Sequence, residues 1–439
     1  MKNNKPTILI IIGISGDLSR RKLLPAIGAI AKTGMIPEQF KIVGVTRQKN
    51  VNLEWLLQNT NNKSYLKDNT ELFEMDLENE KDYKRLDEYL NILDQRFGDF
   101  TQHLFYLSVP PNVSKSIIEL IGKSGLGKKE NTKLLLEKPF GTDLKSAKEL
   151  VGHINKHFKS EQVYCIDHYL AKETAQNIIV FREGNSLFKK TWNKDFIERI
   201  EINISEKIGI EGRANFYEQT GALRDFQSHL LQLLALILMD LPRGDNLEGV
   251  PSLRLKALKY LKIKNALRGQ YEGYVDEVKN KESGVETFIS VKLESKDKRW
   301  IGVPIILTTG KSLKDKFTEI KILYKKDKDN ESNELILHLQ PEEGIQFNMW
   351  AKQPGYEHNI KPHNLNFKFR EHYNVLPEAY EQVLFNAINS DHSLFTTSDE
   401  IIEAWKILDS LQKTWSKNKD GLIIYEKGSS ANEIINKIK

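Results

Sequence analysis

Short apolar runs alternate with stretches of helical periodicity in the first 167 residues. The runs predict five strands, which are Ile8–Ile12, Phe40–Val45, Leu104–Val109, Lys133–Leu136 and Val163–Ile166. Leu18–Lys32 predicts a helix with a kink or local break at Pro25, because proline lacks the amide hydrogen that a helix interior needs. Strands that are apolar throughout and alternate with helices are typical of a parallel, doubly wound sheet. The pattern therefore predicts an α/β domain over residues 1–167.

After residue 167 many apolar and polar positions alternate, as they do in half-buried antiparallel strands. The predicted strands are Glu198–Ser205, Glu286–Glu294, Val303–Thr308, Thr318–Tyr324, Glu334–Leu339 and Gly344–Trp350. Helices are predicted between them, notably at Leu223–Met239 and Glu400–Leu411. Residues 168–439 are therefore interpreted as an α+β domain on a mainly antiparallel sheet. We expect the charged run Lys325–Asn333 to be a solvated hairpin turn, and the polar tail after Lys417 to be loosely held.

The composition is that of an ordinary globular protein and narrows the classes of function. A net charge of +5 over 439 residues is small, so no nucleic-acid partner is expected, although anionic small ligands are compatible with it. No apolar run is long enough to span a bilayer, and Ile8–Ile12 is too short for a signal peptide. The single cysteine, Cys165, lies in an apolar run and is interpreted as an inert core thiol. We therefore expect a cytoplasmic protein without membrane partners.

A segment with two glycines follows the first predicted strand and opens the predicted helix. It reads Gly13-Ile14-Ser15-Gly16-Asp17-Leu18. Glycines at such a turn let the backbone approach a pyrophosphate, and the helix N-terminus supplies amide donors and a favourable dipole. The full G-x-G-x-x-G pattern is missing, so the segment alone fits a plain turn about as well as a dinucleotide site. The candidate cofactor contacts in it are Gly13, Ser15, Gly16, Asp17 and Leu18.

The end of the second predicted strand indicates which dinucleotide is bound. Val43-Gly44-Val45-Thr46-Arg47 ends where an NAD enzyme places an acidic residue for the ribose 2′-hydroxyl. Arg47 stands there instead, and a guanidinium can hold a 2′-phosphate through two parallel hydrogen bonds. The alternative is a surface arginine at a strand end. Its position after two matching elements favours the role in NADP binding.

Side chains with catalytic chemistry are densest directly after the last strand of the first domain. Asp167-His168-Tyr169-Leu170-Ala171-Lys172 places a carboxylate, an imidazole, a phenol and an ammonium in six consecutive positions. Asp167 is expected where a strand ends and a helix begins, which is where an open α/β sheet binds ligands. His168, Tyr169 and Lys172 are then expected around the positive end of that helix, a natural anion site. The alternative is a polar turn with solvated side chains.

Two further positions and one turn carry candidate chemistry. Lys138, in Glu137-Lys138-Pro139-Phe140-Gly141, follows a predicted strand and is expected to point into the ligand crevice. His229 begins an apolar helical stretch and suits a general base, whose tautomer a carboxylate such as Asp167 would fix. The alternative is a helix histidine with a local partner. The turn Gly310–Lys316 contains three lysines and is either solvated or a phosphate clamp.

In their order along the chain, these segments resemble the glucose-6-phosphate dehydrogenase family. The matching segments cover nearly the whole chain, and they are Gly13–Ala26, Val43–Gln48, Glu137–Gly141, Ile166–Glu173, Glu211–Arg213, Gly221–Asp225, Arg299–Pro304, Gly310–Lys311, Glu378–Glu381 and Asp399–Trp405. The resemblance implies oxidation of glucose 6-phosphate to 6-phosphogluconolactone with NADP, the first step of the oxidative pentose phosphate pathway. It also implies a Rossmann-like NADP-binding domain, followed by an α+β domain that binds substrate and forms a homodimer or homotetramer.

The resemblance assigns roles residue by residue. His229 matches the base that removes the proton of the sugar C1 hydroxyl, and Asp167 matches its carboxylate partner. Lys138 matches a lysine shared by cofactor and substrate, and Arg47 matches the ligand of the 2′-phosphate. The other substrate-binding positions face the phosphate (His168, Tyr169 and Lys172), the sugar hydroxyls (Glu206 and Asp225) or the substrate as further cations (Lys311 and Lys316). No metal is implied.

Some positions depart from the family pattern. The segment Asp225-Phe226-Gln227-Ser228-His229 is one residue shorter than usual, which is expected to rotate Asp225 by roughly 100° relative to the following helix and leaves its role open. Thr308 replaces a common arginine, and the chain is somewhat short for the family, so a second, structural NADP site is not assumed. Two alternatives remain open. One is another NADP-dependent sugar dehydrogenase of the same two-domain plan, and the other is a non-catalytic NADP-binding relative.

Overall fold

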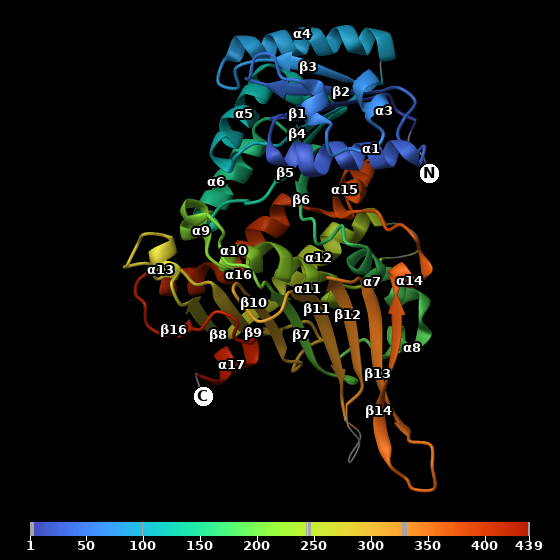
Figure 1. Cartoon of the computed structure of the whole chain (residues 1–439), viewed down its shortest axis with the longest axis vertical. Helices are drawn as coiled ribbons and strands as arrows, with labels where there is room; N and C mark the ends of the chain where they lie inside the picture. Colours follow the sequence, from blue (N-terminus) through green and yellow to red (C-terminus); the bar gives the residue numbers. More distant parts are fainter. Residues whose placement is uncertain (1–3, 99, 243, 245–246, 327–331, 438–439) are drawn as a thin grey trace.

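The computed structural model describes residues 4–98, 100–242, 244, 247–326 and 332–437, and these residues form two sheets with helices around and between them (Figure 1). The first sheet has the strand order β15-β6-β5-β4-β1-β2-β3. Six of its strands run parallel, and they are β1 (Thr7–Ile12), β2 (Phe40–Thr46), β3 (Thr70–Glu74), β4 (Gln102–Leu107), β5 (Thr132–Glu137) and β6 (Val163–Ile166). The edge strand β15 (Phe395–Thr396) pairs antiparallel with β6.

Both faces of the first sheet are covered by helices, because its strands are apolar on both sides. Ile8, Ile10 and Ile12 of β1 pack into one hydrophobic core, whereas Leu9 and Ile11 point into a second core on the opposite face. The helices of this unit are α1 (Leu24–Lys32), α2 (Leu53–Leu56), α3 (Lys63–Asn69), α4 (Glu80–Phe97), α5 (Pro111–Lys123), α6 (Leu144–Asn155) and α15 (Ala379–Ile388), with short helices η1 (Ser19–Leu23), η2 (Leu126–Lys128) and η3 (Ser160–Gln162).

The second sheet is larger and mainly antiparallel. Its order is β14-β13-β12-β11-β7-β10-β9-β8-β16, with parallel pairing only between β7 and β10 and between β8 and β16 among the described strands. The strands are β7 (Ile197–Ser205), β8 (Leu261–Tyr271), β9 (Phe288–Ser295), β10 (Ile305–Gly310), β11 (Phe317–Tyr324), β12 (Glu334–Gln340), β13 (Gly344–Lys352), β14 (Ile360–Lys368) and β16 (Leu422–Tyr425). The fold class expected from the sequence is thus confirmed.

A layer of helices lies between the two sheets (Figure 1). Its centre is α11 (Leu231–Leu238), which is apolar almost all round and buried at every position. It continues from α10 (Leu223–Asp225) through the π-helical turn η4 (Phe226–Leu230). The other helices of the second unit are α7 (Glu173–Gly184), α8 (Ser186–Thr191), α9 (Ala214–Thr220), α12 (Val250–Lys259), α13 (Tyr274–Glu277), α14 (Phe369–His372), α16 (Ser398–Trp415) and α17 (Ala431–Asn436), with η5 at Leu247–Gly249.

All eleven strands predicted above are present, with ends shifted by at most two residues. The helix predicted over Leu18–Lys32 contains the π-helical turn Ser19–Leu23 just before Pro25, so the break at the proline takes the form of a wide turn. The prediction for the tail after Lys417 is wrong, because Tyr425 and Ile434 are fully buried. Residues 327–331 of the charged run Lys325–Asn333 lie outside the described residues.

The boundary at residue 167 stays a prediction, and β15 shows that late residues contribute to the first sheet. Within the described residues, none of the helices has the length and apolar character that crossing a membrane requires.

Candidate active site

Five loops meet at one edge of the first sheet. Gly13, Arg47, Ser108, Lys138 and Asp167 follow the carboxyl ends of β1, β2, β4, β5 and β6. Because these strands are parallel, their carboxyl ends share an edge, which is where open α/β sheets bind ligands. The helical layer and the second sheet face this edge (Figure 1).

A cavity of about 580 Å³ opens beside the glycine loop. It is lined by Gly13, Ser15, Gly16, Thr46, Arg47, Gln48, Asp76, Leu77, Glu78, Ser108, Val109 and several neighbours from the start of α5. Gly13 has a φ of +90°, and a Cβ added to it would lie 2.5 Å from Ser108 O. Only glycine fits against Ser108, and Gly13 lines the cavity, so its backbone can contact a ligand there. A dinucleotide therefore fits the residues present.

The loop is fixed by hydrogen bonds from both neighbouring strands. The amides of Gly13 and Ile14 donate to Val45 O at the end of β2, and Ser19 Oγ donates to Ser108 Oγ at 2.8 Å. Asp17 and Leu18 begin the helix beside the loop but are not among the residues that line the cavity. Asp17 instead forms an exposed ion pair with Arg21.

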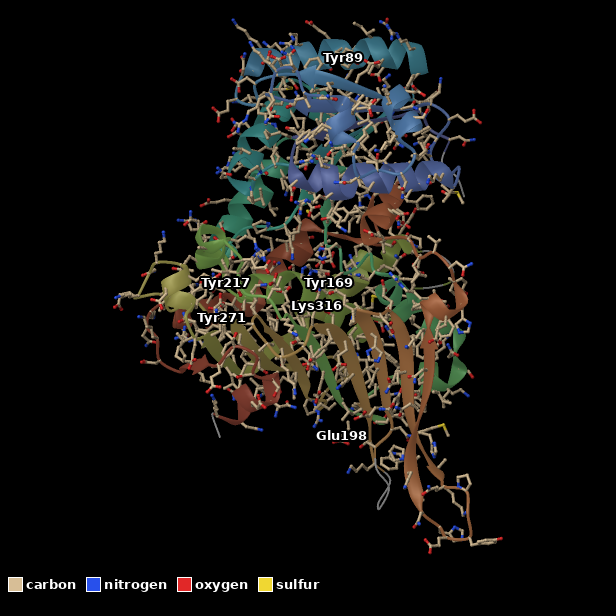
Figure 2. The ribbon with its side chains drawn as sticks, viewed as in Figure 1. Tyr89, Tyr169, Glu198, Tyr217, Tyr271 and Lys316 are labelled. Carbon is tan, nitrogen blue, oxygen red and sulfur yellow. The ribbon has the colours of Figure 1, made fainter. Side chains whose placement is uncertain are left out.

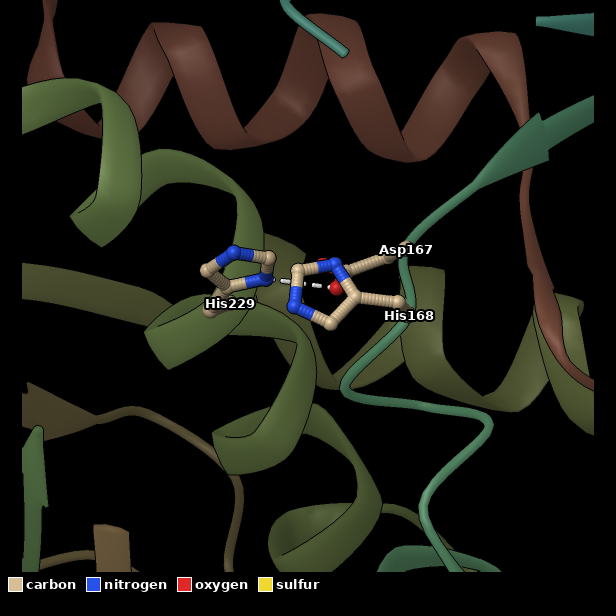
Figure 3. Close-up of side chains that lie close together, drawn as sticks. All are labelled: Asp167, His168 and His229. Atoms are coloured by element: carbon tan, nitrogen blue, oxygen red, sulfur yellow. Dashed lines mark hydrogen bonds and ion pairs between the residues drawn. The ribbon is translucent and has the colours of Figure 1, made fainter. Parts of the chain in front are cut away.

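The central contact of the candidate site joins the two units. His229 Nδ1 lies 2.5 Å from Asp167 Oδ1, and both side chains are buried (Figure 3). Asp167 Oδ1 also accepts the amide hydrogen of Tyr169 at 3.0 Å. Since Nδ1 donates to the carboxylate, the imidazole has its other nitrogen, Nε2, free of hydrogen and able to accept a proton. The arrangement is that of a histidine base oriented by a carboxylate.

Lys138 lies on the Nε2 side of this histidine. Its ammonium contacts His229 Nε2 and is 3.5 Å from Asp225 Oδ1. Asp225 is also 3.3 Å from the Arg224 guanidinium. The predicted rotation of Asp225 away from the site is therefore not seen. Asp225 and His229 are four residues apart, a spacing that places both on one face of a helical turn.

Burial and neighbouring charges set the protonation states of Asp167, Asp225 and His229. Burial acts to raise the pKa of Asp167, but the attraction to protonated His229, the hydrogen bond from His229 and the charge of Lys138 outweigh burial and hold that pKa well below its usual range. Burial likewise opposes ionisation of Asp225, yet Lys138, Arg224 and Lys311 depress its pKa. Burial lowers the pKa of His229, against the opposing effect of Asp167. The site thus holds two carboxylates charged and its base neutral.

The other residues of the Asp167–Lys172 run surround the base. The Tyr169 ring centroid is 4.0 Å from that of His229, and the His168 ring meets His229 edge-on at 4.9 Å. Burial lowers the pKa of His168 well below its ordinary value, and His229, when it is protonated, and Lys138 act in the same direction. Burial raises the pKa of the Tyr169 phenol, although a hydrogen bond with Thr318 opposes the shift. Lys172 lies 3.8 Å from Glu343 Oε1.

A pair of residues from the second sheet completes the cluster of charged side chains. Glu206 follows β7 and Lys311 follows β10, two strands that run parallel and pair Ser205 with Gly310. The Lys311 ammonium contacts Glu206 Oε2. Lys316 is exposed just before β11, and Figure 2 labels it beside Tyr169 in that view. Thr318, two residues after Lys316, forms a hydrogen bond with Tyr169, so the turn that contains Lys316 lies near Tyr169.

Asp167, His168 and His229 also have donor atoms within 4.8 Å of one another, as three metal ligands would (Figure 3). Nδ1 of His229, however, is engaged by Asp167, and Nε2 faces the ammonium of Lys138. A neighbouring ammonium repels a cation, so these residues suit proton transfer better than metal binding.

The structure also brings in residues that the sequence reasoning did not single out. Arg224, part of a matched segment, contacts Asp225, and Glu343 contacts Lys172. Glu343 lies in the turn after β12 and has no motif around it. The sequence offers only an indirect indication of this contact. Lys172 precedes the helix but cannot accept hydrogen bonds from its first amides, so an acceptor from another part of the chain is needed.

Comparisons with known proteins show which family the chain resembles. Residues 10–177 match the family model "Glucose-6-phosphate dehydrogenase, NAD binding domain", and residues 179–438 match "Glucose-6-phosphate dehydrogenase, C-terminal domain". The chain is 34% identical to glucose-6-phosphate 1-dehydrogenase of Chlamydia muridarum over 94% of its length and 91% of the relative's. It is also 34% identical to the Bacillus subtilis enzyme of the same name, over 98% of this chain and 96% of the relative.

A solved structure of glucose-6-phosphate dehydrogenase in complex with glucose 6-phosphate superposes with a TM-score of 0.92 at 29% identity. The match covers 100% of this chain and 97% of that one. The two-domain match, the relatives at 34% identity and the shared architecture lead to one conclusion: the chain belongs to the glucose-6-phosphate dehydrogenase family, whose members are dehydrogenases.

Proposed function

We propose that the protein oxidises glucose 6-phosphate at C1 to 6-phosphogluconolactone and transfers the hydride to NADP. The observation that carries the proposal is the array Asp167–His229–Lys138 at the carboxyl edge of the first sheet. It places a neutral, oriented base at the same edge of the first sheet as the glycine loop. The relatives at 34% identity carry the corresponding enzyme name.

His229 acts as the general base in this proposal. The C1 hydroxyl donates its proton to Nε2, the nitrogen that faces Lys138 in the structure. Asp167 keeps Nδ1 protonated and stabilises the imidazolium that forms, because its own pKa is held low and it stays charged. Loss of the proton and departure of the hydride from C1 together convert the hemiacetal into the lactone.

The substrate is held at two ends. His168, Tyr169 and Lys172 bind its phosphate, with Lys311 and Lys316 as further cations on the substrate side. Glu206 and Asp225 accept hydrogen bonds from the sugar hydroxyls. Lys138 is assigned to both ligands, because it contacts Asp225 and His229 on the substrate side and follows β5 at the sheet edge where the cofactor is proposed to bind. Holding the sugar at both ends aligns C1 with the base and with the hydride acceptor.

NADP binds at the glycine loop in this proposal and supplies the hydride acceptor. Gly13, Ser15 and Gly16 line the cavity and offer backbone contacts to its phosphates, while Asp17 and Leu18 are proposed at its helix start. Arg47 lines the rim and binds the 2′-phosphate. Asp76 and Glu78 line the same cavity, so the guanidinium offsets an otherwise acidic wall.

The test is NADPH formation with glucose 6-phosphate, beside free glucose and beside the His229→Ala variant. We expect fast turnover of the phosphorylated sugar, near-silence with free glucose, and a loss of about 10²–10⁴-fold in kcat in the variant. The partly exposed His153 on α6, in the first unit, provides a matched control, His153→Ala. Equal rates with both sugars would favour another sugar dehydrogenase, and an inactive wild type would favour a non-catalytic relative.

Two further features of the protein belong to the proposal. A homodimer or homotetramer would form through the second sheet, where Ile360 and Leu365 of β14 are 58% and 60% exposed. A cytoplasmic location fits the single cysteine, because one cysteine cannot form a disulfide within the chain. Cys165 is also buried, and burial raises its pKa to about 12. Such a thiol is protonated and inert at neutral pH.

A further inference from the structure

Helix α7 begins directly after the Asp167–Lys172 run, and its N-terminus is capped from outside. Lys172 occupies the N-cap position with extended backbone, and its side chain makes no capping hydrogen bond in the described part of the chain. An α-helix begins with amide groups that have no partner within the helix. A lysine cannot accept a hydrogen bond from them, so an acceptor must come from another element.

Glu343, in the turn between β12 and β13, supplies that acceptor. Its Oε2 accepts the amide hydrogen of Thr174 at 2.8 Å, and its Oε1 is 3.8 Å from the Lys172 ammonium. The Thr174 hydroxyl donates to His338 O at the end of β12, also at 2.8 Å. One carboxylate from the second sheet therefore fixes both the first turn of α7 and the lysine that precedes it.

The electrostatics of this contact favour a fixed carboxylate. Glu343 has 14% of its side chain exposed and Lys172 has 22%, so water screens the pair only in part. The positive end of the α7 dipole adds to the attraction for Glu343. Burial and the negative charge of Glu343 raise the pKa of Glu173. The ammonium of Lys172 has three donors, and its single contact with Glu343 leaves others for a phosphate.

We propose that Glu343 is a positioning residue that orients Lys172 toward the phosphate of the substrate. The inference rests on the proposed function, because it assigns Lys172 to the phosphate site. Asp167 bonds the Tyr169 amide at one end of the run, and Glu343 bonds the Thr174 amide at the other. The two carboxylates hold the phosphate-binding turn from opposite ends, and each comes from a different sheet.

The test compares Glu343→Ala with Glu343→Gln in the full-length enzyme. The alanine variant loses both contacts, and we expect KM for glucose 6-phosphate to rise about tenfold to a hundredfold. Inorganic phosphate, used as a competitive inhibitor, should lose affinity in parallel, because it probes the same lysine without the sugar. The glutamine variant keeps an acceptor for the Thr174 amide, so we expect its KM to rise by less than in the alanine variant.

Glu342→Ala is the matched control, because the neighbouring Glu342 is exposed and pairs with Lys368. It removes the same charge from the same turn, and it should leave both KM for glucose 6-phosphate and the inhibition constant of phosphate unchanged. The inference is overturned if Glu343→Ala leaves KM for glucose 6-phosphate unchanged, or if KM for NADP rises with it, which would indicate a general structural defect. An inactive wild type would instead refute the proposed function and is recognised before any variant is made.

Discussion

His229 Nδ1 and Asp167 Oδ1 are 2.5 Å apart although 62 residues separate them in the chain. Asp167 follows the last parallel strand of the first sheet, and His229 lies in the helical layer between the sheets. The base and its orienting carboxylate therefore come together only when the two units have packed. Neither unit alone contains the pair.

Replacing Asp167 by asparagine tests the orienting role of that contact. The amide removes the charge that stabilises the imidazolium and can present its NH₂ group to Nδ1, which favours the wrong tautomer. We expect kcat to fall about 10²–10⁴-fold with little change in KM for NADP. Steady-state kinetics with both substrates provide the measurement. Asp68→Asn, at an exposed position on α3, should be indistinguishable from the wild type.

The pH dependence of kcat/KM for glucose 6-phosphate should report the lowered pKa of His229 in the ligand-free enzyme. Burial favours its neutral form, with Lys138 acting in the same direction and Asp167 and Asp225 opposing. A base with a depressed pKa stays active at lower pH, so the acid limb should have its midpoint below the ordinary value of 6.5. In Asp167→Asn the limb should move further down, because the charge favouring protonation is gone. A midpoint above that of free histidine would contradict the assignment.

Arg47 should control the choice between the two nicotinamide cofactors. Arg47→Ala removes the guanidinium proposed to hold the 2′-phosphate, so KM for NADP is expected to rise about tenfold to a hundredfold. KM for NAD should change little, since NAD lacks that phosphate. The nearby Lys49 is also exposed and cationic, and Lys49→Ala tests whether charge near the site is sufficient. An equal effect of both variants would count against a specific contact.

Two glycine substitutions separate backbone strain from steric exclusion at the cofactor loop. Gly34 has a φ of +70° with open space around it, whereas a Cβ on Gly13 would meet Ser108 O. Gly34→Ala should cost about 1–2 kcal/mol in the free energy of unfolding, for the left-handed backbone alone. Gly13→Ala should destabilise more and also weaken NADP binding. Urea unfolding and KM for NADP measure the two effects, and similar values for both variants would refute the steric account.

A buried ion pair should dominate the stability of the contact between α12 and α16. Arg254 Nε donates to Glu400 Oε1 at 2.8 Å, and neither side chain is exposed. The same guanidinium donates to the carbonyls of Ser393 and Phe395. Arg254→Ala leaves a buried carboxylate without its partner and should cost about 3–5 kcal/mol. Lys256→Ala, which breaks an exposed pair on the same helix, should barely change the urea midpoint.

The sequence predicted those elements whose hydrophobic pattern matches their burial. Ile8–Ile12 was recognisable because every residue of β1 is buried. Strand β14 was missed because Pro362 and a run of polar residues interrupt its apolar positions, and all nine of its residues are exposed. The tail was misjudged for a related reason. Its packing depends on one short apolar run, Leu422–Tyr425, and on Ile434, inside an otherwise polar segment.

The candidate site was predictable where a residue follows a strand directly. Lys138 and Asp167 follow β5 and β6, so the parallel sheet alone brings them to one edge. The meeting of Asp167 with His229 depends on how the units pack, which local pattern does not encode. The orientation of Asp225 depends on the path of the helix between it and His229. The role of Glu343 could not be predicted from the sequence, because its partner Thr174 lies in a distant helix.

Strand β15 has a consequence for the order in which the chain can fold. Phe395 and Thr396 cover the β6 edge of the first sheet, yet they follow β6 by about half the chain. While the chain is being synthesised, that edge stays open until nearly all of the second unit has left the ribosome. An open strand edge invites pairing with other chains. A fragment that ends near residue 177 should therefore be prone to aggregation, even though it contains every parallel strand of its sheet.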